Sequence, residues 1–247
     1  YRSKKEGQEE VFLDPNKLSE DGSTSLSSIA FTKDGSLFAY AVSVAGSDWR
    51  DIYVMDTKNK TLLDDQIKDA KFTGISWQGK KGFYYSTYAQ PDGSKLSALT
   101  NDHRLYFHQL GTSQAEDILV FGNERTPKRY VSGRVTEDGQ VLVISAANST
   151  TGNELYIKDL IKTESTIRPI VTNMDHNHDV LDHQKGWLLV QTNKDAPNNR
   201  LVKIDLNNPK SENWQVLIPE KEEVMQVSKG GGKLFATYLK DAISEVR

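Results

Sequence analysis

Two histidines and two aspartates in one short stretch are the residues whose types best suit metal chemistry. Asp175, His176, His178 and Asp179 bring together imidazole and carboxylate ligands, which several divalent cations accept. In a strand, residues i and i+2 share a face, so the two imidazoles would point the same way. The stretch is polar, however, and it precedes an apolar strand, where Asx-type turns are common. We therefore expect a solvated loop here, with no metal and no cofactor.

Nucleophilic catalysis is the second chemistry to consider, and the sequence argues against it. The chain has no cysteine, which excludes a thiolate nucleophile, a thiolate zinc site and a disulfide. A serine nucleophile of the α/β-hydrolase type needs a Gly-x-Ser-x-Gly turn, because a strained strand-to-helix turn exposes its hydroxyl. We predict no catalytic residue in this chain, since none of its four Gly-Ser pairs has that frame: Gly22-Ser23, Gly35-Ser36, Gly46-Ser47 and Gly93-Ser94.

Charge and hydropathy exclude two further classes of partner. The 247 residues carry 31 Lys and Arg against 34 Asp and Glu, a formal net charge of −3 without any long basic run. We therefore expect no nucleic-acid partner and no polybasic membrane patch. No window approaches about 18 consecutive apolar residues, and residues 1–7 lack an apolar core, so we expect a soluble chain without membrane span or signal peptide. The sequence does not distinguish a cytoplasmic from a periplasmic protein.

The elements that would position any site follow from an internal repeat. A turn that contains glycine precedes an apolar strand five times, and the second residue of that turn is glycine 35, 82, 139, 186 and 232. The intervals of 47, 57, 47 and 46 residues are the size of a propeller blade. A second marker, an alternating strand at 52–56, 105–110, 155–160 and 201–206, stays in phase with the first.

Each repeat contains four short strands joined by polar turns. This pattern is typical of a β-propeller built from four-stranded antiparallel blades. A β-sandwich has strands at similar spacing, but it does not require a sequence that repeats in phase, so we favour the propeller. Residues 9–13 resemble the last strand of a preceding blade, and residues 224–238 resemble the first two strands of a following blade. We expect one partial propeller over 1–247, with four complete blades and two half-blades, as a fragment of a larger protein.

Several loop segments resemble the propeller domain of the prolyl oligopeptidase (prolyl endopeptidase) family. They read VFLDPN at 11–16, GSDW at 46–49, LGT at 110–112, EDIL at 116–119 and DAPN at 195–198. The resemblance runs along essentially the whole chain. It implies a serine peptidase, a hydrolase that cuts short proline-containing peptides after proline. In that family a seven-bladed propeller lies as a lid over an α/β-hydrolase domain that holds a Ser-Asp-His triad. This chain would then be the gate for the substrate, with the catalytic domain outside it.

The resemblance also implies substrate-binding residues. Tyr84 aligns with an aromatic that helps to line the pocket for the substrate residue two places before the scissile proline bond. A position in the core between blades is the alternative for Tyr84. Tyr130 aligns with an apolar pocket residue of the family and differs from it in type. The family places an arginine in the loop that corresponds to 146–152, where this chain has none, so that contact is missing or replaced.

Two other functions stay open. A propeller without enzymatic activity would bind a peptide or protein partner across its face, and a propeller enzyme would carry its own active site in the channel. The missing nucleophile and the weak metal pattern argue against the second of these. Exposed strand edges on the two half-blades would favour edge-to-edge self-association. Alternatively, the two halves would pair to close a five-bladed ring, but we favour the open arc because ring closure would strain every interface between blades.

Overall fold

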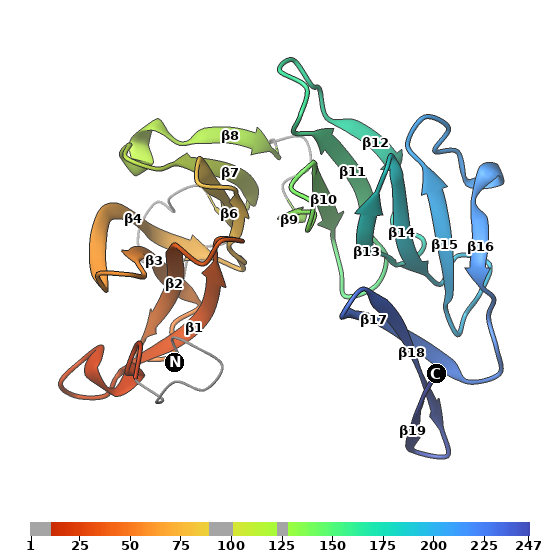
Figure 1. Ribbon diagram of the computed structural model, residues 1–247, viewed down its shortest axis with the longest axis horizontal. Helices are drawn as coiled ribbons and strands as arrows, with labels where there is room; N and C mark the ends of the chain where they lie inside the picture. Colours follow the sequence, from red (N-terminus) through yellow and green to blue (C-terminus); the bar gives the residue numbers. More distant parts are fainter. Residues whose placement is uncertain (1–10, 89–100, 123–127) are drawn as a thin grey trace. The chain divides into compact units, whose positions relative to one another are not determined.

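The computed structural model describes residues 11–88, 101–122 and 128–247, in which 19 strands and three short 3-10 helices occur (Figure 1). The chain divides into two compact units, Tyr1–Lys128 and Arg129–Arg247, which we describe separately. Within each sheet the strands pair in chain order, and every pair is antiparallel. In the described part of the chain, no helix is long and apolar enough to cross a membrane.

The N-terminal unit contains two four-stranded sheets. Helix η1 precedes the first sheet, and η2 precedes the last strand of the second sheet. The bounds are η1 Pro15–Lys17, β1 Thr24–Phe31, β2 Leu37–Val44, β3 Trp49–Asp56, β4 Thr61–Lys71, β5 Ser76–Gln78, β6 Gly82–Thr87, β7 Arg104–Gln109, η2 Gln114–Glu116 and β8 Ile118–Phe121.

The C-terminal unit contains two four-stranded sheets and one three-stranded sheet. Helix η3 precedes the outermost strand of the second of these sheets. The bounds are β9 Tyr130–Val135, β10 Val141–Ala147, β11 Glu154–Asp159, β12 Arg168–Val171, β13 His178–Gln184, β14 Trp187–Thr192, β15 Arg200–Asp205, η3 Ser211–Asn213, β16 Gln215–Ile218, β17 Val224–Gly230, β18 Lys233–Lys240 and β19 Ile243–Val246.

The predicted all-β class and the four complete blades are confirmed, and the two ends of the pattern differ from the prediction. Residues 11–13 are not in a strand, because Phe12 and Leu13 instead pack against the buried side chains of Phe38 and Tyr40. Residues 9 and 10 of that predicted strand lie outside the described residues. At the other end, 224–238 does form two strands, but β19 adds a third.

Strand β19 lies outside both markers of the repeat, and the turn before it contains no glycine. Asp241 and Ala242 make this turn with left-handed φ angles of 49° and 61°, a conformation that usually favours glycine. The glycine turn that precedes the second strand of each sheet therefore has no counterpart before β19, the third strand of its sheet.

The core lies between neighbouring sheets. Strand β6 is buried along its whole length, and most residues of β2 and β10 are buried, because these second strands have a sheet face on both sides. The first strands alternate between half-buried and exposed residues, as β1 shows. Strand β1 contacts β5, and β13 contacts β17, so the first strands are the inner strands of successive blades.

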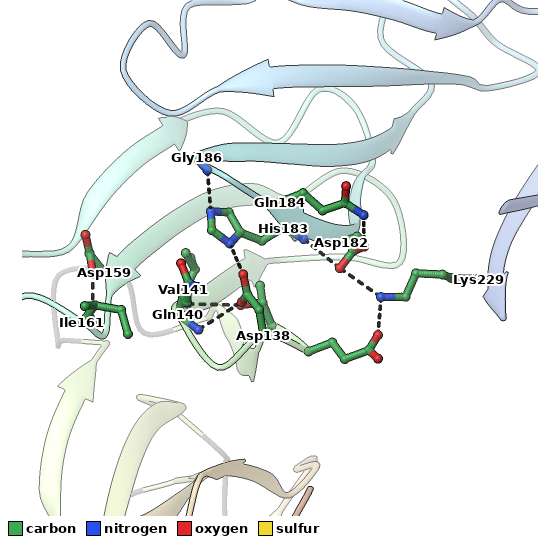
Figure 2. A network of polar contacts seen from close by, with 12 residues as sticks. Asp138, Gln140, Val141, Asp159, Ile161, Asp182, His183, Gln184, Gly186 and Lys229 are labelled. Carbon is green, nitrogen blue, oxygen red and sulfur yellow. Dashed lines mark hydrogen bonds and ion pairs between the residues drawn. The ribbon is translucent and has the colours of Figure 1, made fainter. Parts of the chain in front are cut away.

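Polar contacts join three sheets of the C-terminal unit near these inner strands (Figure 2). Lys229, from β17, lies 2.9 Å from the carboxylate of Asp182 in β13 and also pairs with Glu137 in the β9–β10 turn. His183, in β13, contacts Asp138 in the same turn. Each charged group in this network therefore faces a partner from another blade.

Candidate functional site

A cavity of about 380 Å³ lies in the C-terminal unit between the sheet β9–β12 and the strand β13. We call it the Arg134 pocket. The two inner strands supply its charged side chains, and further polar side chains come from β10, from the β10–β11 loop and from the segment before β13. Its lining residues are Ser132, Arg134, Val143, Ser145, Ala147, Ser149, Thr150, Gly152, Asn153, Leu155, Asn177, His178, Asp179 and Val180.

Strand β9 presents one face to this pocket. Side chains alternate along a strand, so Tyr130, Ser132 and Arg134 share a face. All three are exposed, whereas Val131 on the opposite face is buried. The guanidinium of Arg134 donates a hydrogen bond to the backbone carbonyl of Val180 in β13, which holds this long side chain across the gap between the two blades.

Asp179 provides the negative charge of the pocket. Its side chain is accessible from the cavity but has protein atoms around it, and this loss of water raises the pKa of its carboxyl above the ordinary value of 3.8. The positive charge of Arg134 acts in the opposite direction and lowers that pKa. The pocket thus offers a guanidinium and a carboxylate from two neighbouring inner strands.

The β10–β11 loop is fixed against the start of β13. Gly152 has a φ of 76°, and a Cβ at this position would lie 1.7 Å from the carbonyl oxygen of Met174, so only glycine fits. Its backbone N–H donates to Asn177 Oδ1 at 2.6 Å. The side chain of Asn153 accepts from the backbone N–H of His178 at 2.7 Å and donates to its carbonyl at 3.1 Å.

This anchoring brings the small side chains of Ser149 and Thr150 to the pocket. They belong to the loop 146–152, where the family resemblance implies an arginine and this chain has none. Small residues there leave the cavity open, and the guanidinium that lines it comes from Arg134 on β9.

The two predicted substrate-binding tyrosines belong to different compact units, and each is described within its own unit. Tyr130 is 48% exposed and lies on the pocket face of β9. Tyr84, in β6, is only 4% exposed. Its hydroxyl donates to Gln78 Oε1 at 2.8 Å, its ring lies 4.9 Å from that of Phe107, and burial raises its pKa to about 12. Both substrate-binding roles stay predictions.

The prediction of a solvated loop is wrong for His178. This residue opens β13 and is 5% exposed. Among the described residues, no group of three or more His, Cys, Asp or Glu side chains is placed to hold a metal ion. Arg134 and Asp179 were not recognised as a site from the sequence, although the alternation along 130–135 places Arg134 on the same strand face as Tyr130.

The chemistry of the Arg134 pocket suits binding. Its charged groups, hydroxyls and amides present both donors and acceptors of hydrogen bonds. Among its lining residues, all of which the structure describes, no serine or threonine hydroxyl bonds to a histidine or a carboxylate, the contact that would activate a nucleophile. The arrangement therefore fits a ligand that is both a donor and an acceptor.

Comparison with known proteins gives the same family along the whole chain. The family model described as "Prolyl oligopeptidase, N-terminal beta-propeller domain" matches residues 1–247. A prolyl endopeptidase of Elizabethkingia meningoseptica is 50% identical over 100% of this chain. Prolyl oligopeptidase A of Amanita bisporigera is 32% identical over 96% of it. The chain spans only 35% and 34% of the lengths of these two relatives.

Solved structures of prolyl endopeptidases and prolyl oligopeptidases have a similar fold over nearly the whole chain. One, from a study of two prolyl endopeptidases and their inter-domain dynamics, has a TM-score of 0.86 at 29% identity and covers 96% of this chain and 34% of its own. Prolyl oligopeptidase B from Galerina marginata, solved bound to a 35mer hydrolysis and macrocyclization substrate, has the same TM-score and identity. It covers 96% of this chain and 35% of its own.

Proposed function

This chain belongs to the prolyl oligopeptidase N-terminal β-propeller family, and we propose that it is the substrate-gating lid of a serine peptidase that cleaves short peptides after proline. The match along all 247 residues carries the proposal. The relatives are almost three times as long as this chain, so we place the α/β-hydrolase catalytic domain outside it. The partners are that domain and short proline-containing peptides, and no cofactor is required because serine-type hydrolysis uses protein groups alone.

The same proposal treats the two compact units as parts of one propeller. The repeat continues in phase from one unit to the next, and each unit consists of the same meandering sheets. A channel lined by inner strands would admit a short, extended peptide and exclude a folded protein. Gating by size then follows from the width of the channel and needs no catalytic group in the lid.

The Arg134 pocket gives the lid a place to hold a peptide. A peptide backbone carries N–H donors and carbonyl acceptors, which the carboxylate of Asp179 and the guanidinium of Arg134 complement. Tyr130 adds an aromatic ring with a hydroxyl on the same face of β9. We therefore propose that Tyr130 and Arg134 contact the substrate, and that Arg134 replaces the loop arginine of the family.

The test uses the whole protein and a short proline-containing peptide with a fluorescent leaving group. We expect cleavage of this peptide and none of the same sequence inside a folded protein. Arg134→Gln is expected to raise KM several-fold with a smaller change in kcat, because it removes binding that the ground state and the transition state share.

Arg168→Gln is the matched control. The guanidinium of Arg168 also donates to a backbone carbonyl, that of Leu206 at 3.1 Å, but Arg168 lies outside the pocket. Both variants lose one such hydrogen bond, so a rise in KM shared by the two would reflect general loosening. An unchanged KM in the folded Arg134→Gln enzyme would exclude Arg134 from the site.

A further inference from the structure

A second cavity of about 210 Å³ lies in the C-terminal unit, between the end of β12 and the start of β13. We call it the His178 pocket, although His178 also borders the Arg134 pocket. Its apolar lining comes from Ile170, Val171 and the indole of Trp214. The lining also includes the nitrogen-bearing side chains of His176, His178 and Lys194. The cavity therefore offers a ligand both apolar surface and hydrogen-bond donors.

His178 is the group in this cavity that lacks a partner. It is 5% exposed, and neither ring nitrogen has a hydrogen-bond partner among the described protein atoms. Burial lowers its pKa, which the nearby carbonyls of Asn153 and His176 only partly offset, so the ring is neutral. Trp214 holds the ring in place by an edge contact, with the centroids 5.8 Å apart at 84°. A buried polar group without a partner is rare in folded proteins.

The charges around His178 favour an anion. The positive charges of His176 and Lys194 act on the ring and lower its pKa further. The Lys194 ammonium lies 3.5 Å from Asp195, whose side chain is 66% exposed, so water weakens this ion pair. Asp175 is the one carboxylate that lines the cavity, and it is exposed to solvent.

We propose that the His178 pocket binds a carboxylate attached to a small apolar body. The apolar body packs against Ile170, Val171 and Trp214, while the carboxylate accepts hydrogen bonds from Lys194 and from the ring of His178. The volume limits the ligand to a small organic acid or to the last residue of a peptide with a free carboxyl terminus. This site is separate from the peptide-gating role and does not depend on it.

Binding at this site is coupled to protons. A carboxylate beside His178 raises the pKa of the ring, so complex formation takes up a proton. The other charged or titratable groups facing the cavity are His176, Lys194 and Asp175. Affinity should therefore fall as the pH rises from about 6 to about 8.

The experiment follows 4-fluorobenzoate by ¹⁹F NMR in the presence of the whole protein. We expect saturable line broadening, and we expect binding about tenfold weaker in Lys194→Met, since one charge-assisted contact is lost. Lys233→Met removes an exposed lysine outside the cavity and should bind as the native protein does. His178→Gln should remove the pH dependence of binding. If His178→Gln does not fold, the affinity of Lys194→Met tests the proposal.

Competition identifies the source of the carboxylate. Displacement of 4-fluorobenzoate by a short peptide with a free carboxyl terminus, and not by the same peptide with an amidated terminus, assigns the site to peptide ends. Displacement only by free organic acids assigns it to small metabolites. Equal displacement by the amidated peptide, or native-like affinity in Lys194→Met, would overturn the proposal.

Discussion

Asp138 Oδ2 lies 2.7 Å from His183 Nδ1, which joins the β9–β10 turn of one blade to the inner strand of the next (Figure 2). The backbone N–H of Gly186 donates to His183 Nε2 at 3.2 Å, so the ring is a neutral imidazole that carries its proton on Nδ1. The other carboxylate oxygen of Asp138 accepts from the Thr136 hydroxyl at 2.6 Å and from the backbone N–H of Gln140. One aspartate therefore closes its own turn and binds the neighbouring blade.

The same arrangement occurs in the N-terminal unit. There Asp34 Oδ1 accepts from the Thr32 hydroxyl at 2.8 Å and from the backbone N–H of Ser36. Asp34 Oδ2 lies 2.6 Å from the ammonium of Lys80 in the next blade. A Thr-x-Asp-Gly turn is thus used twice as a contact between blades, with a different partner each time.

We predict that Asp138→Asn destabilises the chain by about 1–3 kcal/mol, because its amide would place an N–H donor against the Nδ1–H of His183. Urea unfolding of the 247-residue chain measures this loss. His183→Phe in the Asp138→Asn background is the control, since it removes the opposing donor and should cost little more. A native-like unfolding midpoint for Asp138→Asn would contradict a stabilising contact.

We predict that the contribution of Asp138 depends on pH in the acidic range. Burial alone would raise the pKa of Asp138, but hydrogen bonds from Thr136, Gln140 and His183 lower it below the ordinary 3.8. A carboxyl with a lowered pKa stabilises the fold above its unfolded value and loses this effect as the pH falls through the folded value. The difference in stability between native protein and Asp138→Asn should therefore shrink below about pH 4.

Lys80→Met tests the equivalent contact in the N-terminal unit. The side chains of Lys80 and Asp34 are 59% and 49% exposed, so water and salt screen this pair. We expect no measurable change in the melting temperature, in contrast to Asp138→Asn. A large loss of stability in Lys80→Met would show that the turn geometry, and not burial of the partner, determines the strength of these contacts.

A buried charge cluster in the N-terminal unit should give the opposite pH dependence. His108 is fully buried, with Nδ1 2.7 Å from Asp117 and Nε2 3.2 Å from Asp65. Tyr85 donates to the other oxygen of Asp117 at 2.7 Å. Because both ring nitrogens face carboxylates, the ring is an imidazolium. Burial alone lowers the pKa of His108, but the two carboxylates raise it by more, so the net shift is upward from 6.5.

We predict that His108→Gln costs about 3 kcal/mol near pH 6, because two buried carboxylates lose their cation. A group with a raised pKa stabilises the fold below its unfolded value and loses this effect as the pH rises through the folded value. The difference in unfolding free energy between native protein and His108→Gln should therefore narrow above neutral pH. A difference that is constant between about pH 6 and pH 10 would exclude the imidazolium.

Two variants of Tyr84 separate a role in substrate binding from a role in the core, because this buried residue could have either. Tyr84→Ala is expected to raise KM for peptides with a bulky residue two places before proline, and also to cost about 3 kcal/mol by leaving a cavity. Tyr84→Phe keeps the ring and loses only the hydrogen bond to Gln78. An unchanged KM in folded Tyr84→Ala enzyme, together with lower stability in both variants, would assign Tyr84 to the core alone.

Self-association of the isolated 247-residue chain is expected from the edge of its three-stranded sheet. All four residues of β19 are exposed, with Ile243 68% and Val246 61% exposed. Such edges pair with other chains. Light scattering should show concentration-dependent association that Ile243→Lys reduces, because a lysine on the edge opposes pairing. A monomer at all concentrations would contradict this expectation.

The amino-acid sequence by itself determined the blades and their order. A glycine turn followed by an apolar strand is a local signal, since it needs only a backbone conformation and a pattern of period two. For that reason the four complete sheets were predicted, whereas β19, which follows the Asp241-Ala242 turn without glycine, was not. Loop segments such as DAPN at 195–198 identified the family for a similar reason, because they are contiguous in the chain.

Only the tertiary structure decided which side chains meet. His183 and Asp138 are 45 residues apart, and Arg134 and Val180 are 46 residues apart, so each pair depends on how one blade packs against the next. His178 belongs to a polar stretch, yet packing against Trp214 buries it. Local patterns carry no information on a partner one blade away, because burial and pairing across blades arise only when the sheets stack.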